Sequence, residues 1–147
     1  MLNELQWGTA ALTQALLGRL GTALQLQGDV LSHAGGFAAQ VDLACTALFP
    51  ALLLLAALAL WGWLDRPAPQ RLALAMLLGL TAMALVNQLR LLAVIWVGVH
   101  APAHFPWVHE VLGPLLLVVA GAAWVAVCVG RAGGNGAGRA RGLPAPG

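Results

Sequence analysis

Three side chains that can take part in chemistry lie next to long apolar stretches of the sequence: Cys45, Arg90 and His109. A cysteine thiolate is a nucleophile, and an imidazole transfers protons near neutral pH. A nearby guanidinium favours the thiolate over the thiol. Together the three groups could form a site around a reactive cysteine, provided that the fold brings them to one place.

The composition is that of a membrane protein. Of the 147 residues, 61% are hydrophobic and only 8% are charged, and the mean hydropathy is +0.85. Soluble domains carry roughly 25% charged residues. A chain of this length cannot bury so many apolar side chains in one core, so we expect lipid to cover much of its surface. The net charge of +2 is too small for a nucleic-acid-binding surface, and we expect no such partner.

The apolar residues gather in three runs. They cover residues 43–64, residues 72–99 with Arg90 as the single charge, and residues 111–130. About 20 apolar residues suffice to cross a bilayer, and a spanning backbone must satisfy its polar groups as a helix. The sequence therefore predicts an all-α, polytopic bundle of three to four transmembrane helices in one domain, residues 1–130. The middle run is long enough to tilt, or to bend near Gly98.

The first 40 residues are less regular. Leucines at near-helical spacing over residues 5–24 predict a helix that Gly21 could end. Arg19 and two glutamines favour a helix in the membrane interface, or a tilted span covered by protein. A translocated N-terminal segment with no helix to lead it would be unusual, which favours four spans with both chain ends cytoplasmic. No cleavable signal peptide is expected.

Two short segments complete the organisation. Weak alternation before and after Gly35-Gly36, over residues 24–30 and 37–43, predicts a short hairpin-like segment ahead of the cysteine. Residues 131–147 are rich in glycine, alanine and arginine, so we expect a disordered cytoplasmic tail.

The arginines orient the three runs. Five of them lie in the first inter-helix loop and in the tail: Arg66, Arg71, Arg131, Arg139 and Arg141. Basic residues mark the cytoplasmic ends of membrane helices. Alternating spans then place Cys45, Arg90 and His109 at the outer ends of three adjacent helices. We expect an integral protein of the inner (cytoplasmic) membrane, with its active site on the outer face and its C-terminus in the cytoplasm.

Arg90 is the most informative of the three. A charge within an apolar run costs a few kcal/mol or more, unless it faces a protein interior or a water-filled cavity. Asn87, one turn earlier on the same helix face, could orient it. The alternative is an arginine that snorkels to the interface. The apolar residues that continue after Arg90 argue against this alternative.

Cys45, taken alone, is more often a small packing residue. We expect it near the start of a helix, with Pro50 in the first turn and Thr46 as a cap. A helix N-terminus and a nearby arginine both favour the thiolate. Cys128 has only apolar neighbours and is expected to be inert. The two cysteines lie at opposite ends of different runs, so no disulfide is expected between them.

A rival interpretation gives the histidines a metal ion or a haem. The candidate ligands are His100, His104, His109 and Glu110. Pro102 and Pro106 prevent a continuous helix here, so these residues share no helical face, and no H-E-x-x-H motif is present. We expect no metal and no cofactor. His33 is expected to be a solvated loop residue.

The order of the motifs resembles the exosortase/archaeosortase family of integral-membrane sorting enzymes. The matching motifs are ACTAL at residues 44–48, NQLR at residues 87–90, and His109; the lead-in at residues 16–44 is also similar. The resemblance covers roughly residues 10–125. Many members have glycine two residues after the cysteine, where this chain has Ala47. The chain resembles the catalytic core of longer members, so we also consider a partner membrane subunit.

The resemblance implies protease and transpeptidase activity on exported proteins that carry a C-terminal sorting signal and a membrane helix. Cys45 would be the nucleophile that forms a thioester, and His109 the general acid or base. Arg90 would stabilise the thiolate or the oxyanion, with Asn87 and Thr46 supporting these groups. The alternative is a non-catalytic membrane subunit with the same fold, which uses Arg90 and His109 to bind a partner or a lipid headgroup.

Overall fold

The computed structural model describes the backbone of residues 2–140 and the side chains of residues 3–43 and 45–130. The α-helices are α1 (Leu2–Arg19), α2 (Leu48–Asp65), α3 (Pro69–His100), the short α4 (Phe105–Trp107) and α5 (Gly113–Ala140). The strands are β1 (Gln25–Gln27), β2 (Val30–Ser32) and β3 (Ala38–Gln40). Two 3-10 turns, η1 (Leu43–Cys45) and η2 (Pro102–His104), and a π-helical turn, η3 (Val108–Leu112), complete the order.

Three helical segments in the described part of the chain are long and apolar enough to cross a membrane. They are Leu48–Asp65, Pro69–His100 and Pro102–Gly130. The predicted three spans and mostly helical fold are thereby confirmed. Helix α1 does not meet these requirements, so the structure gives no support for a fourth span. Helix α5 continues to Ala140, and residues 141–147 lie outside the described residues, so the disordered tail stays a prediction.

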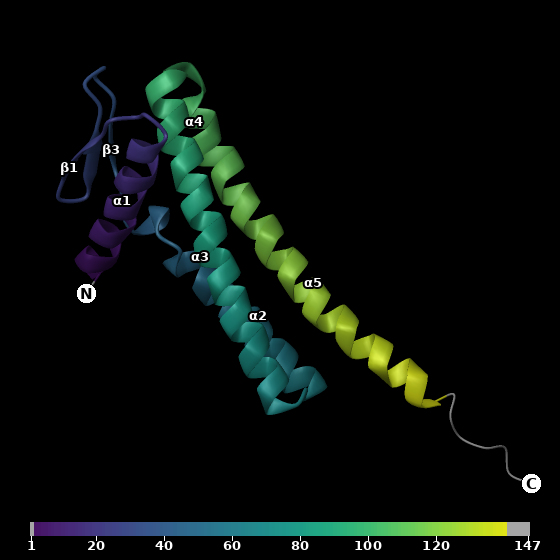
Figure 1. Cartoon of the computed structure of the whole chain (residues 1–147). Coiled ribbons are helices and arrows are strands. Elements are labelled where there is room, and N and C mark those ends of the chain that lie inside the picture. The colour runs from purple at the N-terminus through teal and green to yellow at the C-terminus, as the bar shows by residue number, and fades with distance from the viewer. Residues whose placement is uncertain (1, 141–147) are drawn as a thin grey trace, which may run out of the picture.

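Helix α3 contacts each of the other long helices, α1, α2 and α5. Figure 1 shows α2 beside the N-terminal part of α3, and α1 and the sheet beside its C-terminal part. Helix α5 starts near the C-terminal end of α3 and runs back along it. The helix continues without interruption through Gly98 to His100. Gly98 is buried there beneath the rings of Phe37 and Phe105. The long middle run is therefore one helix, whose last turns are covered by protein.

Helix α1 ends just before Gly21, as the sequence predicts. Gly21 adopts a positive φ of 85°, and the Thr22 amide donates back to the Leu17 carbonyl at 2.9 Å. The side chain of Gln88 on α3 donates to the hydroxyl of the buried Thr13 at 2.8 Å. This contact fixes α1 against the C-terminal half of α3.

The hairpin-like segment is a three-stranded antiparallel sheet in the order β1-β2-β3. Gly28, with φ 66°, and Asp29 make the first turn, and Gly36, with φ 91°, lies in the second. Both glycines adopt backbone conformations that L-residues avoid. The central strand was not predicted, since it extends beyond the predicted stretch of residues 24–30.

Two cores hold these elements together. The upper core joins α1, the sheet, η1 and the C-terminal half of α3, and consists of Ala10, Leu17, Leu24, Leu31, Val41, Cys45, Leu91 and Ile95. The lower core joins α2, the N-terminal half of α3 and α5, and consists of Leu54, Leu58, Trp61, Ala75, Met83, Leu117 and Cys128. The cysteine with chemical interest and the expected inert one therefore lie in different cores, which excludes a disulfide between them.

Candidate active site

Cys45 is the last residue of the turn η1, three residues before α2 begins. Its amide donates to the Asp42 carboxylate Oδ1 at 3.0 Å and to the Asp42 carbonyl at 3.1 Å. Its own carbonyl accepts a hydrogen bond from Asn87 Nδ2 on α3, also at 3.0 Å. Both polar groups of the Cys45 main chain are therefore fixed, one by its own turn and the other by α3.

Thr46 does not cap α2 as predicted. The N-cap of α2 is Ala47, and no side chain makes a capping hydrogen bond there. Thr46 is 0% exposed, and its hydroxyl donates back to the Leu43 carbonyl at 2.7 Å, accepting only a long 3.4 Å bond from the Leu48 amide. The hydroxyl thus closes η1 instead of opening α2. Pro50 does lie in the first turn of α2, as expected.

The expectation that the site favours the thiolate is also wrong for the substrate-free protein. Cys45 is only 4% exposed, and this burial raises the pKa of its thiol, because an apolar environment disfavours the charged form. The Asp42 carboxylate raises the pKa further as a hydrogen-bond acceptor and as a negative charge. The positive charge of Arg90 acts in the opposite direction. Cys45 also lies ahead of the first turn of α2, outside the helix N-terminus that was expected to help.

Arg90 faces the protein interior, as predicted. It is 6% exposed, whereas a snorkelling arginine would lie on the surface. Its side chain passes close to Gly113 at the start of α5, so close that a Cβ on that glycine would collide with Nε. The Val108 carbonyl lies 3.2 Å from the same Cβ position. Gly113 therefore makes room for the guanidinium between α3 and α5.

His109 lies in the π-helical turn η3. Its ring stacks parallel on Phe105, with centroids 5.4 Å apart and an interplanar angle of 3°. The Nδ1 atom is buried and has no hydrogen-bond partner within the described residues. No hydrogen bond joins the ring to the Cys45 thiol among these residues either. The neighbouring Glu110 is exposed.

Arg90 and His109 both line an open groove with a volume of ≈ 950 Å³. Its walls are Phe49, Pro50 and Leu53 of α2, Met83 of α3, and a face of α5 at residues 114–129. Arg90, His109 and Glu110 supply its polar groups, and the rest of the wall is almost entirely apolar. Cys45 does not line the groove; the residues that follow it at the start of α2 do.

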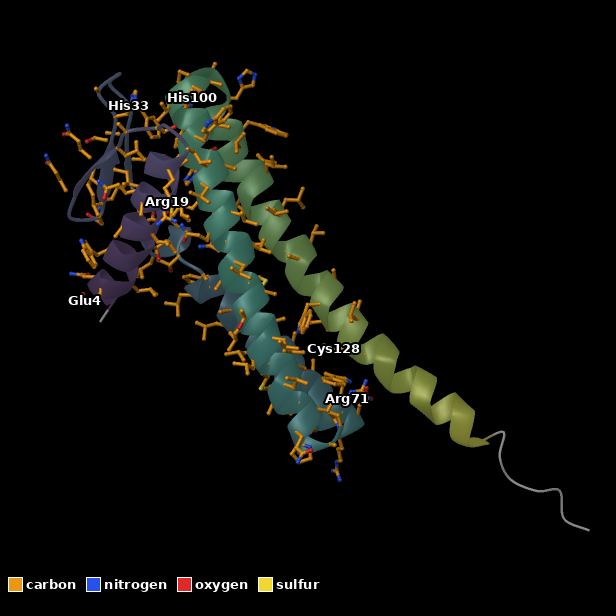
Figure 2. All side chains as sticks on the ribbon, viewed as in Figure 1. Glu4, Arg19, His33, Arg71, His100 and Cys128 are labelled. Atoms are coloured by element: carbon orange, nitrogen blue, oxygen red, sulfur yellow. The ribbon has the colours of Figure 1, made fainter. Side chains whose placement is uncertain are left out.

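His33 and His100 have hydrogen-bond partners of their own, outside the groove. Figure 2 shows His33 and His100 at one end of the molecule and Arg71 at the other. His100 bonds the Trp96 carbonyl at 2.9 Å, and His33 accepts from the Gly35 amide at 3.0 Å. Among the described residues, no group of three or more His, Cys, Asp or Glu side chains could hold a metal ion. The structure therefore offers the metal interpretation no ligand cluster.

Two residues of the site were not found from the sequence. Asp42 precedes Cys45 by three residues, a spacing at which an aspartate often caps a short turn, so its signal was available but weak. Gly113 carried no signal, because its role depends on the path of the Arg90 side chain across from another helix.

Comparison with known proteins adds one finding. The family model described as transmembrane exosortase (Exosortase_EpsH) matches residues 1–126, which include every residue of the site. No curated protein and no solved structure matches the chain at the significance required.

Proposed function

The chain belongs to the transmembrane exosortase family, and from this premise we propose that it is a membrane-embedded cysteine protease and transpeptidase. It would cleave a C-terminal sorting signal from exported proteins and transfer the protein to an acceptor. The protein is an integral membrane protein with three candidate spans. We place its active site at the outer face and its C-terminus in the cytoplasm, as the arginine distribution favours.

One observation carries the proposal: two side chains of α3 act on Cys45. The Asn87 amide holds the Cys45 carbonyl, and the Arg90 charge opposes the rise in the pKa of the thiol. These residues lie far apart in sequence, yet the fold brings a cation and a fixed amide to the only cysteine of the upper core. A buried arginine beside a buried cysteine is more than packing requires.

The proposed reaction has two halves. The Cys45 thiol gives its proton to His109, and the sulfur attacks the scissile carbonyl, with Arg90 stabilising the negative oxygen. The C–N bond then breaks as His109 returns the proton to the leaving amine, which leaves a thioester. In the second half His109 takes a proton from the acceptor, whose attack on the thioester breaks the C–S bond, and the proton then passes from His109 to the Cys45 sulfur. Asn87 and Thr46 hold the turn that carries the cysteine.

The groove supports a membrane-bound substrate. Its apolar wall extends along η3 and α5 from His109 to Val129, which is about 30 Å at 1.5 Å per residue. This length equals the hydrocarbon thickness of a bilayer. A substrate helix entering from the lipid could lie along this wall with its cleavage site at the polar end, beside Arg90 and His109. Lipid would cover the groove at other times.

A non-catalytic subunit with the same fold is the second candidate. The raised pKa of the Cys45 thiol and the lack of a hydrogen bond between Cys45 and His109 among the described residues favour it. In that case Arg90 and His109 would bind a partner membrane subunit or a lipid headgroup.

The discriminating experiment compares Cys45→Ala with Cys128→Ala in the native host. Cys45→Ala should leave exported proteins with their sorting signals uncleaved, whereas Cys128→Ala should process them normally. In the Cys128→Ala protein, a membrane-impermeant maleimide should label Cys45 from the outer face of spheroplasts. Unchanged processing in Cys45→Ala would favour the non-catalytic subunit, and labelling only after permeabilisation would refute the proposed orientation.

A further inference from the structure

Asp42 is the acidic group in closest contact with the cysteine. Its carboxylate Oδ1 accepts from the Cys45 amide at 3.0 Å and caps the turn η1. The same carboxylate also raises the pKa of the Cys45 thiol, as an acceptor and as a negative charge. The main chain and the thiol of one residue therefore share a single anionic partner, three residues earlier in the chain.

We propose that Asp42 is a positioning residue of this site: its carboxylate fixes the turn that carries Cys45 and restrains the reactivity of the thiol in the substrate-free protein. The inference rests on the proposed role of Cys45 as a nucleophile. A turn cap alone needs only an acceptor, and asparagine or serine would serve equally well. An aspartate adds a negative charge beside a group that must itself become negative to react.

The same contact bears on how the oxyanion is stabilised. The main-chain N–H of a nucleophile is a frequent oxyanion donor. Here the Cys45 N–H already donates to both the carbonyl and the carboxylate of Asp42. It is therefore directed away from a substrate in this state, and the stabilising charge must come from the Arg90 side of the site. Asp42 and Arg90 thus act on Cys45 in opposite senses, one against the thiolate and the other in its favour.

Few other ionisable groups face the cysteine. Asp42 lies in its own turn and Arg90 on α3, and these are the two charges that act on the Cys45 thiol. Helix α1 also packs here, but Ala10 and Leu17, its residues in the upper core, do not ionise. A change at Asp42 should therefore be readable directly in the titration of the thiol.

The test is the pH dependence of Cys45 alkylation by iodoacetamide in the purified full-length chain. A Cys128→Ala background makes Cys45 the sole thiol. Asp42→Asn keeps an acceptor for the turn and removes the charge, whereas Asp42→Ala removes both. Asp29→Asn is the matched control, because the Asp29 carboxylate bonds Gln40 in the sheet at 3.0 Å and does not act on Cys45. Rates are measured from about pH 6 to about pH 10, the range that brackets thiol titration.

In Asp42→Asn, the alkylation midpoint should move to lower pH, and the rate near neutral pH should rise about three- to tenfold, since one pKa unit changes the thiolate fraction tenfold. The plateau at high pH, where every thiol is ionised, should not rise, because a thiolate of lower pKa is not more nucleophilic. Asp29→Asn should match its parent. An unmoved midpoint in Asp42→Asn, or a higher plateau without a shift, would show that Asp42 only caps the turn and would overturn the proposal.

This outcome is independent of the proposed reaction. If Cys45 alkylates with a shifted midpoint but Cys45→Ala still processes exported proteins, Asp42 restrains the thiol and the catalytic role fails. If Asp42→Ala does not fold, Asp42→Asn alone decides the matter, because it keeps the acceptor that the turn needs.

Discussion

The side-chain amide of Asn87 on α3 donates a 3.0 Å hydrogen bond to the main-chain carbonyl of Cys45, which lies in the turn before α2. Both residues are buried, Asn87 with 2% of its surface exposed. The bond joins two segments that are 42 residues apart. It directly links the helix that carries Arg90 to the turn that carries the cysteine.

Replacing Asn87 by alanine should destabilise the protein by about 1–3 kcal/mol, because the Cys45 carbonyl would be left buried without a partner. Thermal unfolding in detergent measures this loss. Gln88→Ala is the matched control: it removes a similar amide bond, to Thr13, away from the cysteine. Asn87→Ala should change the alkylation rate of Cys45, and Gln88→Ala should not. Equal alkylation in both variants would contradict a link between Asn87 and the site.

Replacing Arg90 by glutamine should slow the alkylation of Cys45 near neutral pH. The sign follows from the charge: a nearby cation favours the thiolate and lowers the pKa of the thiol, so its removal raises the pKa. The midpoint of the alkylation profile should move to higher pH. Arg71→Gln is the control, since Arg71 lies at the other end of α3 over the ring of Trp61. If both variants titrate alike, Arg90 does not act on the thiol.

Gly113→Ala should disturb the position of Arg90. The new methyl group would collide with Arg90 Nε and approach the Val108 carbonyl to 3.2 Å, and overpacking of this kind costs about 1–3 kcal/mol. Alkylation of Cys45 should slow, as in the Arg90 variant. Gly121→Ala, lower on the same helix, meets only Met83 at an ordinary 3.7 Å. Its unfolding temperature should hold or rise, since alanine favours helix over glycine. Matching results at the two glycines would refute the steric role of Gly113.

Thr46→Val should destabilise the turn although the side chain keeps its shape. The lost hydroxyl donates to the Leu43 carbonyl at 2.7 Å in a part-buried bond, and that carbonyl keeps the Thr46 amide as a donor at 3.2 Å, so removal of the hydroxyl should cost about 0.5–1.5 kcal/mol. Thr46→Ser retains the hydroxyl and should recover most of this loss. The comparison is made by thermal unfolding of the two variants. A serine variant as unstable as the valine variant would attribute the effect to the methyl group instead.

Much of the architecture was predictable because it depends on local properties of the chain. Hydropathy and length located the three spans, and Gly21 marked the end of α1. The burial of Arg90 could also be predicted from the local sequence. A charge with apolar residues on both sides is tolerated where it faces the protein interior or a water-filled cavity.

The errors share one cause: they concern where a side chain points after packing. Thr46 has the residue type of a cap, but its hydroxyl turns back to Leu43 because the chain forms a 3-10 turn ahead of α2. The thiolate was expected from a helix end and an arginine, while burial of Cys45 and the contact with Asp42 prevail. Neither the burial of this one cysteine nor its contact with the Asp42 carboxylate of the same turn can be deduced from a hydropathy pattern.

The geometry of the site depends on how many residues the π-helical turn at residues 108–112 contains. Such a turn holds one residue more than an α-helix would, and each α-helical residue advances the side-chain direction by about 100°. The turn therefore sets the angular phase between His109 and the groove-lining face of α5. Deleting one residue there would leave a helix of nearly the same length and hydropathy, yet direct His109 away from the groove that Arg90 also lines. At this point in the chain, the count of residues matters to the chemistry as much as their identity.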